Sequence, residues 1–117
     1  MSIYEHIGGN DVLRTAVSVL YGRVTDDPTL AAWFDGVDMT RLKAHQRAFL
    51  TAALDGPQVF TGLDLGAAHH DMAITDAAFT SVTTHLLVTL ADLGVAPGVV
   101  DQVESRLESL RPLVVQA

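Results

Sequence analysis

Apolar residues recur at spacings of three and four along most of this chain, and this periodicity restricts the fold more than any other feature of the sequence. The spacing gathers apolar side chains on one face of a helix. No segment alternates polar and apolar residues convincingly over the length of a strand. The sequence therefore predicts an all-α protein with four substantial helices and two short ones, and its length suits a single domain over residues 1–117.

Capping and helix-breaking residues mark the predicted helix boundaries. Gly8-Gly9 predicts a tight turn, after which Asn10 or Asp11 caps the first long helix. A short helix is predicted to start at Asp27-Pro28. The next helix starts at Asp38 and ends at residues 55–57, a later one starts at Thr75 or Asp76 and ends at Gly94, and the last starts at Pro97. A second short helix is expected around the sequence AAHHDM, residues 67–72, after a loop with two glycines.

Composition and charge exclude several classes of protein. The chain has no cysteine, which excludes disulfides, thiolate metal sites and covalent attachment of a cofactor through a C-x-x-C-H motif. Its net charge of −7 argues against nucleic-acid binding, which needs clustered basic residues. The apolar runs are too short for a membrane span, and the first residues lack the basic start and apolar stretch of a signal peptide. A cytoplasmic location is therefore expected.

Histidines are the main candidates for metal ligands in a chain without cysteine. The five histidines do not form H-x-x-x-H or H-E-x-x-H spacings, and the motifs G-x-S-x-G and G-x-G-x-x-G are absent too. His45 lies on a predicted helix, and His69 lies beyond a glycine-containing loop that can fold the two segments over one another. Two such segments can enclose a flat ligand. Haem is such a ligand, because it is largely apolar and takes an imidazole on its iron.

Two hydrogen-bond donors lie on the predicted inner faces of these helices. Gln46 follows His45 on an otherwise apolar side of its helix, and Tyr21 belongs to the apolar stripe of the first long helix. O2 bound to ferrous haem carries partial negative charge, so a phenol or amide donor strengthens its binding by about 1.5–3 kcal/mol. A buried tyrosine hydroxyl also needs a partner, which a bound gas supplies.

The residues that carry this pattern resemble those of one family, the group I truncated haemoglobins. The resemblance covers the chain from Tyr4 to about Leu113. It is carried, in this order and spacing, by YEHIGGNDVL at 4–13, LYGRVTDDPTLAAWFDGVDM at 20–39, RLKAHQRAFLTAALDGP at 41–57 and FTGLDLGAAHH at 60–70. It implies a truncated globin, a two-on-two helical sandwich around a non-covalent haem b. No counterpart exists here of the C-terminal histidine by which some cyanobacterial members attach haem covalently.

The resemblance assigns roles to individual residues. His69 matches the proximal iron ligand, whereas His70 stands one position too late. Tyr21 and Gln46 match the distal tyrosine and glutamine that bond the gas ligand. Phe34 matches the phenylalanine on the haem face, and Leu42 falls at a variable distal position, where leucine leaves hydrogen bonding to Tyr21 and Gln46. The remaining matches to pocket- or tunnel-lining positions are Phe49, Leu50, Phe60 and Phe79.

His45 has two interpretations. The sequence AHQRAF is very similar to the AHQKAF of cyanobacterial members, in which this histidine can bind the iron from the distal side. The alternative is a partly exposed imidazole that pairs with a haem propionate. Lys43 and Arg41 are further candidates for contacts with propionates, against the alternative of solvated helix residues.

Three functions remain open from the sequence. The first is a haem protein that binds O2, NO and CO, converts NO and bound O2 to nitrate, and depends on an unidentified reductase to restore ferrous iron. The second is a six-coordinate, bis-histidyl haem protein in redox or gas sensing, in which His45 competes with ligands. The third is a haem-free helical interaction module, which would be colourless and would leave the polar residues unexplained. A monomer or a weak dimer is expected.

Overall fold

The computed structural model describes residues 2–54, 56 and 75–115, apart from the side chains of residues 113 and 114. Its elements are α1 (Ile3–Ile7), α2 (Gly9–Asp26), the 3-10 helix η1 (Ala31–Phe34), α3 (Met39–Ala53), α5 (Asp76–Asp92) and α6 (Pro97–Val114). The described residues form no strand, which confirms the predicted all-α class. The second short helix predicted around residues 67–72 lies outside the described residues.

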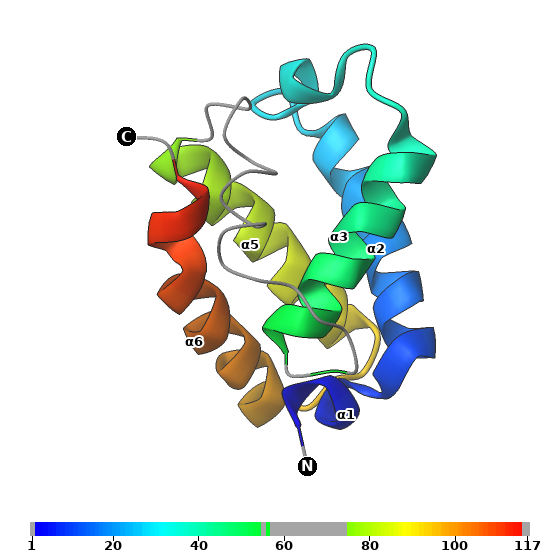
Figure 1. Cartoon of the computed structure of the whole chain (residues 1–117), viewed down its shortest axis with the longest axis vertical. Coiled ribbons are helices and arrows are strands. Elements are labelled where there is room, and N and C mark those ends of the chain that lie inside the picture. The colour runs from blue at the N-terminus through cyan, green and yellow to red at the C-terminus, as the bar shows by residue number, and fades with distance from the viewer. Residues whose placement is uncertain (1, 55, 57–74, 116–117) are drawn as a thin grey trace.

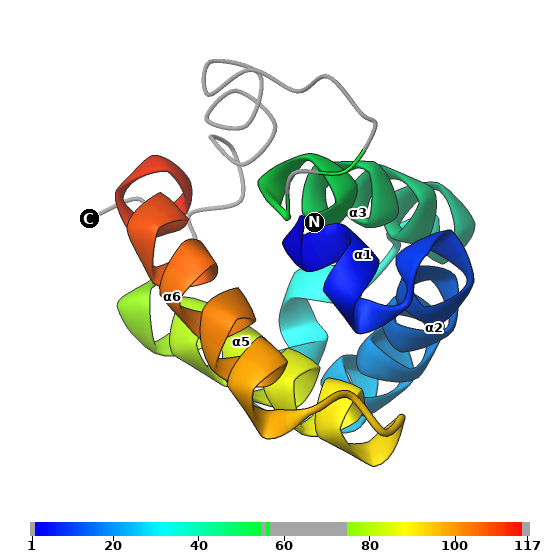
Figure 2. The same cartoon turned by 90° about the horizontal axis from the view of Figure 1, so that it is seen from below.

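The four long helices form two pairs that lie side by side, with α5 and α6 on the left of Figure 1 and α2 and α3 on the right. One pair is α2 with α3 and the other is α5 with α6, and the pairs meet where α2 packs against α5. Figure 2 shows the two pairs as the two arms of a V, with α1 beside α3 and α2. The short α1 contacts both α2 and α6, so it links the pairs at one end. Leu13, Leu20, Leu90 and Val103 are buried in the core between them.

Three of the predicted helix starts are confirmed. The Asp38 carboxylate accepts a hydrogen bond from the backbone N–H of Arg41 at 3.2 Å and caps α3. The Thr75 hydroxyl accepts one from the N–H of Ala78 at 3.1 Å and caps α5. Pro97 is the first residue of α6, where its missing N–H costs no helical hydrogen bond.

The predicted cap of the first long helix is wrong. Asn10 and Asp11 lie inside α2, and Gly8 occupies the cap position without any side-chain hydrogen bond. Gly8 has φ of +116°, a backbone conformation that glycine adopts at little cost. It ends α1 and starts α2 together, so α2 begins before any capping side chain. The five-residue α1 was not predicted, because it is too short to show a helical period. The one residue that marks its start in the sequence is Ser2, a common capping residue, and its hydroxyl accepts a hydrogen bond from the N–H of Glu5 at 3.1 Å.

The short helix after α2 begins later than predicted. Asp27 ends α2, and its carboxylate accepts a hydrogen bond from the backbone N–H of Thr29 at 2.9 Å, which stabilises a turn instead of a helix start. The helix η1 begins only at Ala31. Hydrogen bonds from His85, and then from Thr29, lower the pKa of Asp27 to about 2.

A group of polar side chains ties α2 to α5, and we call it the α2–α5 clasp: Arg23, Asp27, His85, Thr89 and Asp92. Arg23 donates to the Thr89 hydroxyl at 3.1 Å and to the Asp92 carboxylate at 2.7 Å. Thr89 is fully buried and donates to the backbone oxygen of His85 at 2.7 Å. Nε2 of His85 lies 2.9 Å from Oδ2 of Asp27. The clasp therefore fixes α5 against the end of α2.

The C-terminal end of α3 is held from two sides. The backbone N–H of Tyr4 donates to the carbonyl of Leu54 at 2.9 Å, and Arg106 donates to the carbonyl of Ala53 at 2.8 Å. These bonds satisfy carbonyl groups that a helix end leaves without partners. Gly56 lies so close to Tyr4 that an added Cβ would be 2.8 Å from the Tyr4 ring. Within the described part of the chain, no helix is long and apolar enough to cross a membrane.

Candidate functional site

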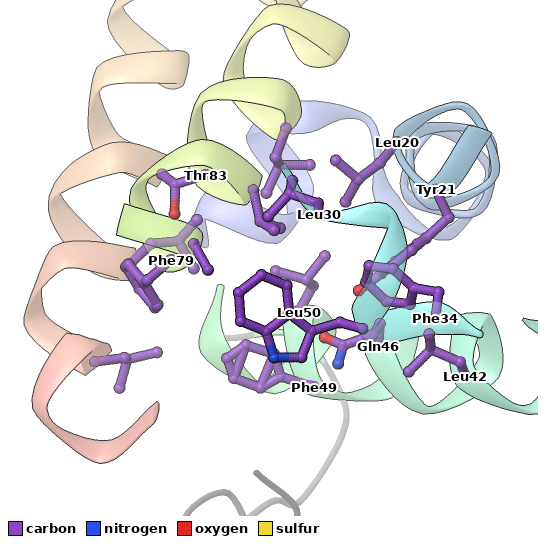
Figure 3. A pocket seen from close by; sticks show the side chains of 16 residues that line it. Leu20, Tyr21, Leu30, Phe34, Leu42, Gln46, Phe49, Leu50, Phe79 and Thr83 are labelled. Atoms are coloured by element: carbon purple, nitrogen blue, oxygen red, sulfur yellow. The ribbon is translucent and has the colours of Figure 1, made fainter. Parts of the chain in front are cut away.

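A pocket opens between the two helical pairs, with an empty volume of about 860 Å³ (Figure 3). This figure includes space that is open to solvent. Most of the lining is apolar, and it comes from α2, η1, α3, α5 and α6: Leu20, Leu30, Trp33, Phe34, Leu42, Phe49, Leu50, Ala78, Phe79, Val82, Leu86, Leu107 and Leu110. Three lining side chains carry a hydroxyl or an amide, namely Tyr21, Gln46 and Thr83.

Tyr21 is buried on α2 and lines the pocket. Its ring meets Phe34 edge to face, with ring centroids 5.8 Å apart and an angle of 76° between the planes. This contact fixes the direction of the phenol. Burial raises the pKa of Tyr21 well above its usual range, so the hydroxyl keeps its proton and acts as a donor. No described residue accepts a hydrogen bond from it, and it opens on the pocket.

Gln46 enters the same pocket from α3. Figure 3 shows its amide pointing into the space that Tyr21 also faces. Leu42, one turn earlier on α3, extends the apolar wall beside it. Phe49 and Leu50 follow on the same helix and are buried. The helical period explains this placement, because residues three, four and seven apart share one helix face.

Phe79 belongs to the opposite wall, on α5. The Arg111 guanidinium lies over its ring, 4.5 Å from the centroid, which is a cation–π contact. Arg111 is itself held by Asp76 at 3.2 Å and Glu108 at 2.8 Å. The hydrogen bond from Arg111 also lowers the pKa of the Glu108 carboxyl. These charged groups restrain the Phe79 ring and are not themselves part of the pocket lining.

The structure thus brings together most of the residues that the sequence predicted for a site. Those that line the pocket are Tyr21, Phe34, Leu42, Gln46, Phe49, Leu50 and Phe79. Lys43 is half-buried and His45 is exposed, and neither lines the pocket. Phe60 and His69 lie outside the described residues, so their predicted roles stay predictions.

Several pocket residues were missed by the sequence reasoning. Thr83 interrupts the apolar stripe of α5 as a polar residue and gave no motif signal. Trp33 adjoins Phe34 in the sequence, and that adjacency is the one available hint. Val82 and Leu86 belong to the apolar stripe of a long helix, which predicts burial but does not distinguish a core position from a pocket wall.

The pocket suits a flat, largely apolar group that presents a hydrogen-bond acceptor to Tyr21 and Gln46. Apolar walls on two sides match the faces of such a group. A buried tyrosine hydroxyl without a protein partner is costly, and an acceptor in the pocket removes that cost. Haem has both properties once its iron holds a small ligand, so the described residues fit this group.

Comparison with known proteins agrees with this geometry. The family model described as bacterial-like globin matches residues 2–116. The group 1 truncated hemoglobin GlbN of Mycolicibacterium paratuberculosis is 37% identical over 111 residues, which cover 95% of this chain and 82% of that protein. The group 1 truncated hemoglobin LI410 of Chlamydomonas moewusii is 39% identical over 99 residues, which cover 83% of this chain and 58% of that protein.

Solved structures give the same result. The Fe(III) form of truncated hemoglobin from Tetrahymena pyriformis has a TM-score of 0.91 at 29% identity, with each chain covered completely. The 2/2 hemoglobin of Synechococcus, in the cyanomet state with covalently attached heme, has a TM-score of 0.89 at 32% identity over 98% of each chain. The chain therefore belongs to the bacterial-like globins, among the group 1 truncated haemoglobins with their two-on-two fold, and this membership supports haem-based binding of diatomic gases.

Proposed function

We propose that this protein binds haem b without a covalent bond and uses Tyr21 and Gln46 to retain O2. The observation that carries the proposal is the buried Tyr21 hydroxyl, which has no protein acceptor among the described residues and opens on an apolar pocket. A bound haem supplies an iron atom that takes up O2, NO or CO. The absence of cysteine supports the non-covalent form, because no thioether bond can be made.

The protein's own contribution is to bind, orient and exclude water. The apolar walls from α2, α3, α5 and α6 hold the haem faces and keep the site dry, which strengthens hydrogen bonds inside it. Phe34 directs Tyr21, and Gln46 adds a second donor from the neighbouring helix. His69 remains the predicted iron ligand. With haem bound, the group would supply the chemistry that converts NO and retained O2 to nitrate. The apolar lining would admit NO, and an unidentified reductase would have to restore ferrous iron.

Haem binding is tested by titration of the purified protein with haemin. Trp33, the one tryptophan in the chain, lines the pocket, so its fluorescence should be quenched as absorbance of bound haem grows, with one haem per chain. His69→Ala should lose the spectrum of an imidazole-ligated haem, and His70→Ala should keep it. Extraction with acidified butanone should remove all haem. An unquenched Trp33, or a His69→Ala spectrum identical to wild type, would contradict the proposal.

The reaction with NO is tested by stopped-flow mixing of the oxygenated protein with NO. The expected result is rapid formation of the ferric protein with one nitrate for each haem. A slow reaction without nitrate would remove this activity and leave gas binding as the function. The six-coordinate alternative needs His45 to turn inward from its exposed position, and it predicts a low-spin ferrous spectrum that His45→Ala abolishes.

A further inference from the structure

Thr83 behaves differently from the other buried or half-buried threonines of the long helices. A helical threonine commonly donates its hydroxyl to the carbonyl four residues earlier. Thr25, Thr51 and Thr89 do so, at 2.8, 2.7 and 2.7 Å. The Thr83 hydroxyl makes no such bond, and no other described residue serves as its partner. The residue Thr83 is only 8% exposed, so this missing bond is not explained by contact of the side chain with bulk solvent.

The free hydroxyl of Thr83 opens on the pocket. No buried side-chain oxygen or nitrogen in the described part of the chain is sealed off without a partner, so this oxygen reaches the cavity that Thr83 lines. Figure 3 shows Thr83 on α5, next to Phe79 and across the pocket from Tyr21. The two helical pairs therefore each present a polar group to the occupant. One wall carries Tyr21 and Gln46, and the other carries Thr83.

We propose that Thr83 is a tuning residue for the redox equilibrium of the bound haem, through the dipole of its hydroxyl group. This inference rests on the proposed haem binding. A hydroxyl that no described residue fixes can rotate so that its oxygen faces the more positive ferric centre, and in a dry apolar pocket its dipole acts at low dielectric. The ferric centre carries one more positive charge than the ferrous centre. The oxygen end of the dipole therefore stabilises the ferric state more, through the polarity and hydrogen bonding that set haem potentials.

The test compares three variants in haem-loaded protein by spectroelectrochemistry. Thr83→Val removes the hydroxyl and keeps the shape. Thr83→Ser keeps the hydroxyl and removes a methyl group. Thr84→Val makes the same chemical change one residue along, at an exposed position outside the pocket.

Thr83→Val should raise the midpoint potential and shift the ferrous-to-ferric ratio about two- to tenfold, the range for one neutral polar contact. A tenfold shift is 59 mV for a one-electron couple. Thr83→Ser and Thr84→Val should stay at the wild-type potential. Without haem, Thr83→Val should unfold at the same or a higher urea concentration, because it removes a buried hydroxyl that has no partner among the described residues.

Three results would overturn the inference: an unchanged or lowered potential in Thr83→Val, an equal shift in Thr83→Ser, or an equal shift in Thr84→Val. Each of these is measured on protein that has taken up haem. Failure of the proposed haem binding has a different signature, since the wild type would then take up no haem and give no potential at all.

Discussion

Replacement of Tyr21 by phenylalanine separates the role of its hydroxyl in ligand binding from its role in packing. The ring is 5% exposed and meets Phe34 edge to face, and phenylalanine preserves both the burial and the ring contact. The lost hydroxyl has no acceptor among the described residues, so its removal breaks no hydrogen bond within that part of the haem-free protein. Removal of a buried, unpartnered hydroxyl should leave its stability unchanged or raise it by up to about 1–3 kcal/mol.

Bound O2 should respond in the opposite direction. A hydrogen bond to an acceptor with partial negative charge is worth about 1.5–3 kcal/mol. At about 1.4 kcal/mol for each factor of ten, Tyr21→Phe should weaken O2 binding about 12- to 140-fold. CO accumulates less negative charge, so its affinity should fall by less.

The assay is stopped-flow measurement of O2 and CO dissociation from the ferrous protein, with urea unfolding of the haem-free protein beside it. Tyr4→Phe is the matched control, because Tyr4 is the other tyrosine of the chain and does not line the pocket. Equal O2 dissociation rates in Tyr21→Phe and wild type, or equal effects on O2 and CO, would refute the reasoning. A large loss of stability in Tyr21→Phe would show that the hydroxyl serves the fold instead.

Further predictions concern stability, measured by urea unfolding unless stated. Gly56→Ala should destabilise by about 1–3 kcal/mol, because the new Cβ would lie 2.8 Å from the Tyr4 ring, whereas Gly98→Ala, with open space around it, should not lose stability through any clash. Leu13→Ala should cost about 2–5 kcal/mol, since Leu13 is 1% exposed and leaves a cavity. Asp27 has a folded pKa of about 2 against an ordinary 3.8, so its contribution to the free energy of unfolding is present above pH 4 and is lost as the pH falls toward 2. The unfolding midpoint of Asp27→Asn should therefore vary less with pH over that window than the midpoint of the wild type. Identical pH profiles of the two proteins would contradict the assignment.

The helices that could be predicted from sequence are those whose ends are set by local chemistry. Asp38 and Thr75 cap helices through side chains three residues before the N–H that they bind, and such spacing is visible in the sequence. The start of α2 depends instead on the backbone conformation of Gly8, which is compatible with either a turn or a helix boundary. The capping preferences of residue types therefore favoured Asn10 and Asp11, the polar residues that follow Gly8 and Gly9, and the prediction was wrong.

The residues of the candidate site also fall into those that the sequence could predict and those that it could not. Tyr21 and Gln46 could be predicted because each is a polar residue on an apolar helix face. A polar side chain in such a position needs a hydrogen-bond partner, and this need indicates a site. Thr83 is also polar on an apolar face, but threonine often satisfies itself by bonding back along its helix, so its sequence position carries no such signal. Only the three-dimensional structure shows that this bond is missing. His45 is on the exposed side of α3, although the period alone cannot distinguish the edge of a helix face from its centre.

The α2–α5 clasp contains none of the pocket-lining residues, and this has a consequence for how the protein is made. The polar contacts between α2 and α5 are therefore made outside the cavity. We expect α2 and α5 to pack together in the newly synthesised chain before it meets haem. The supply of the pigment, and not the folding of the polypeptide, would then limit how much coloured protein a cell contains.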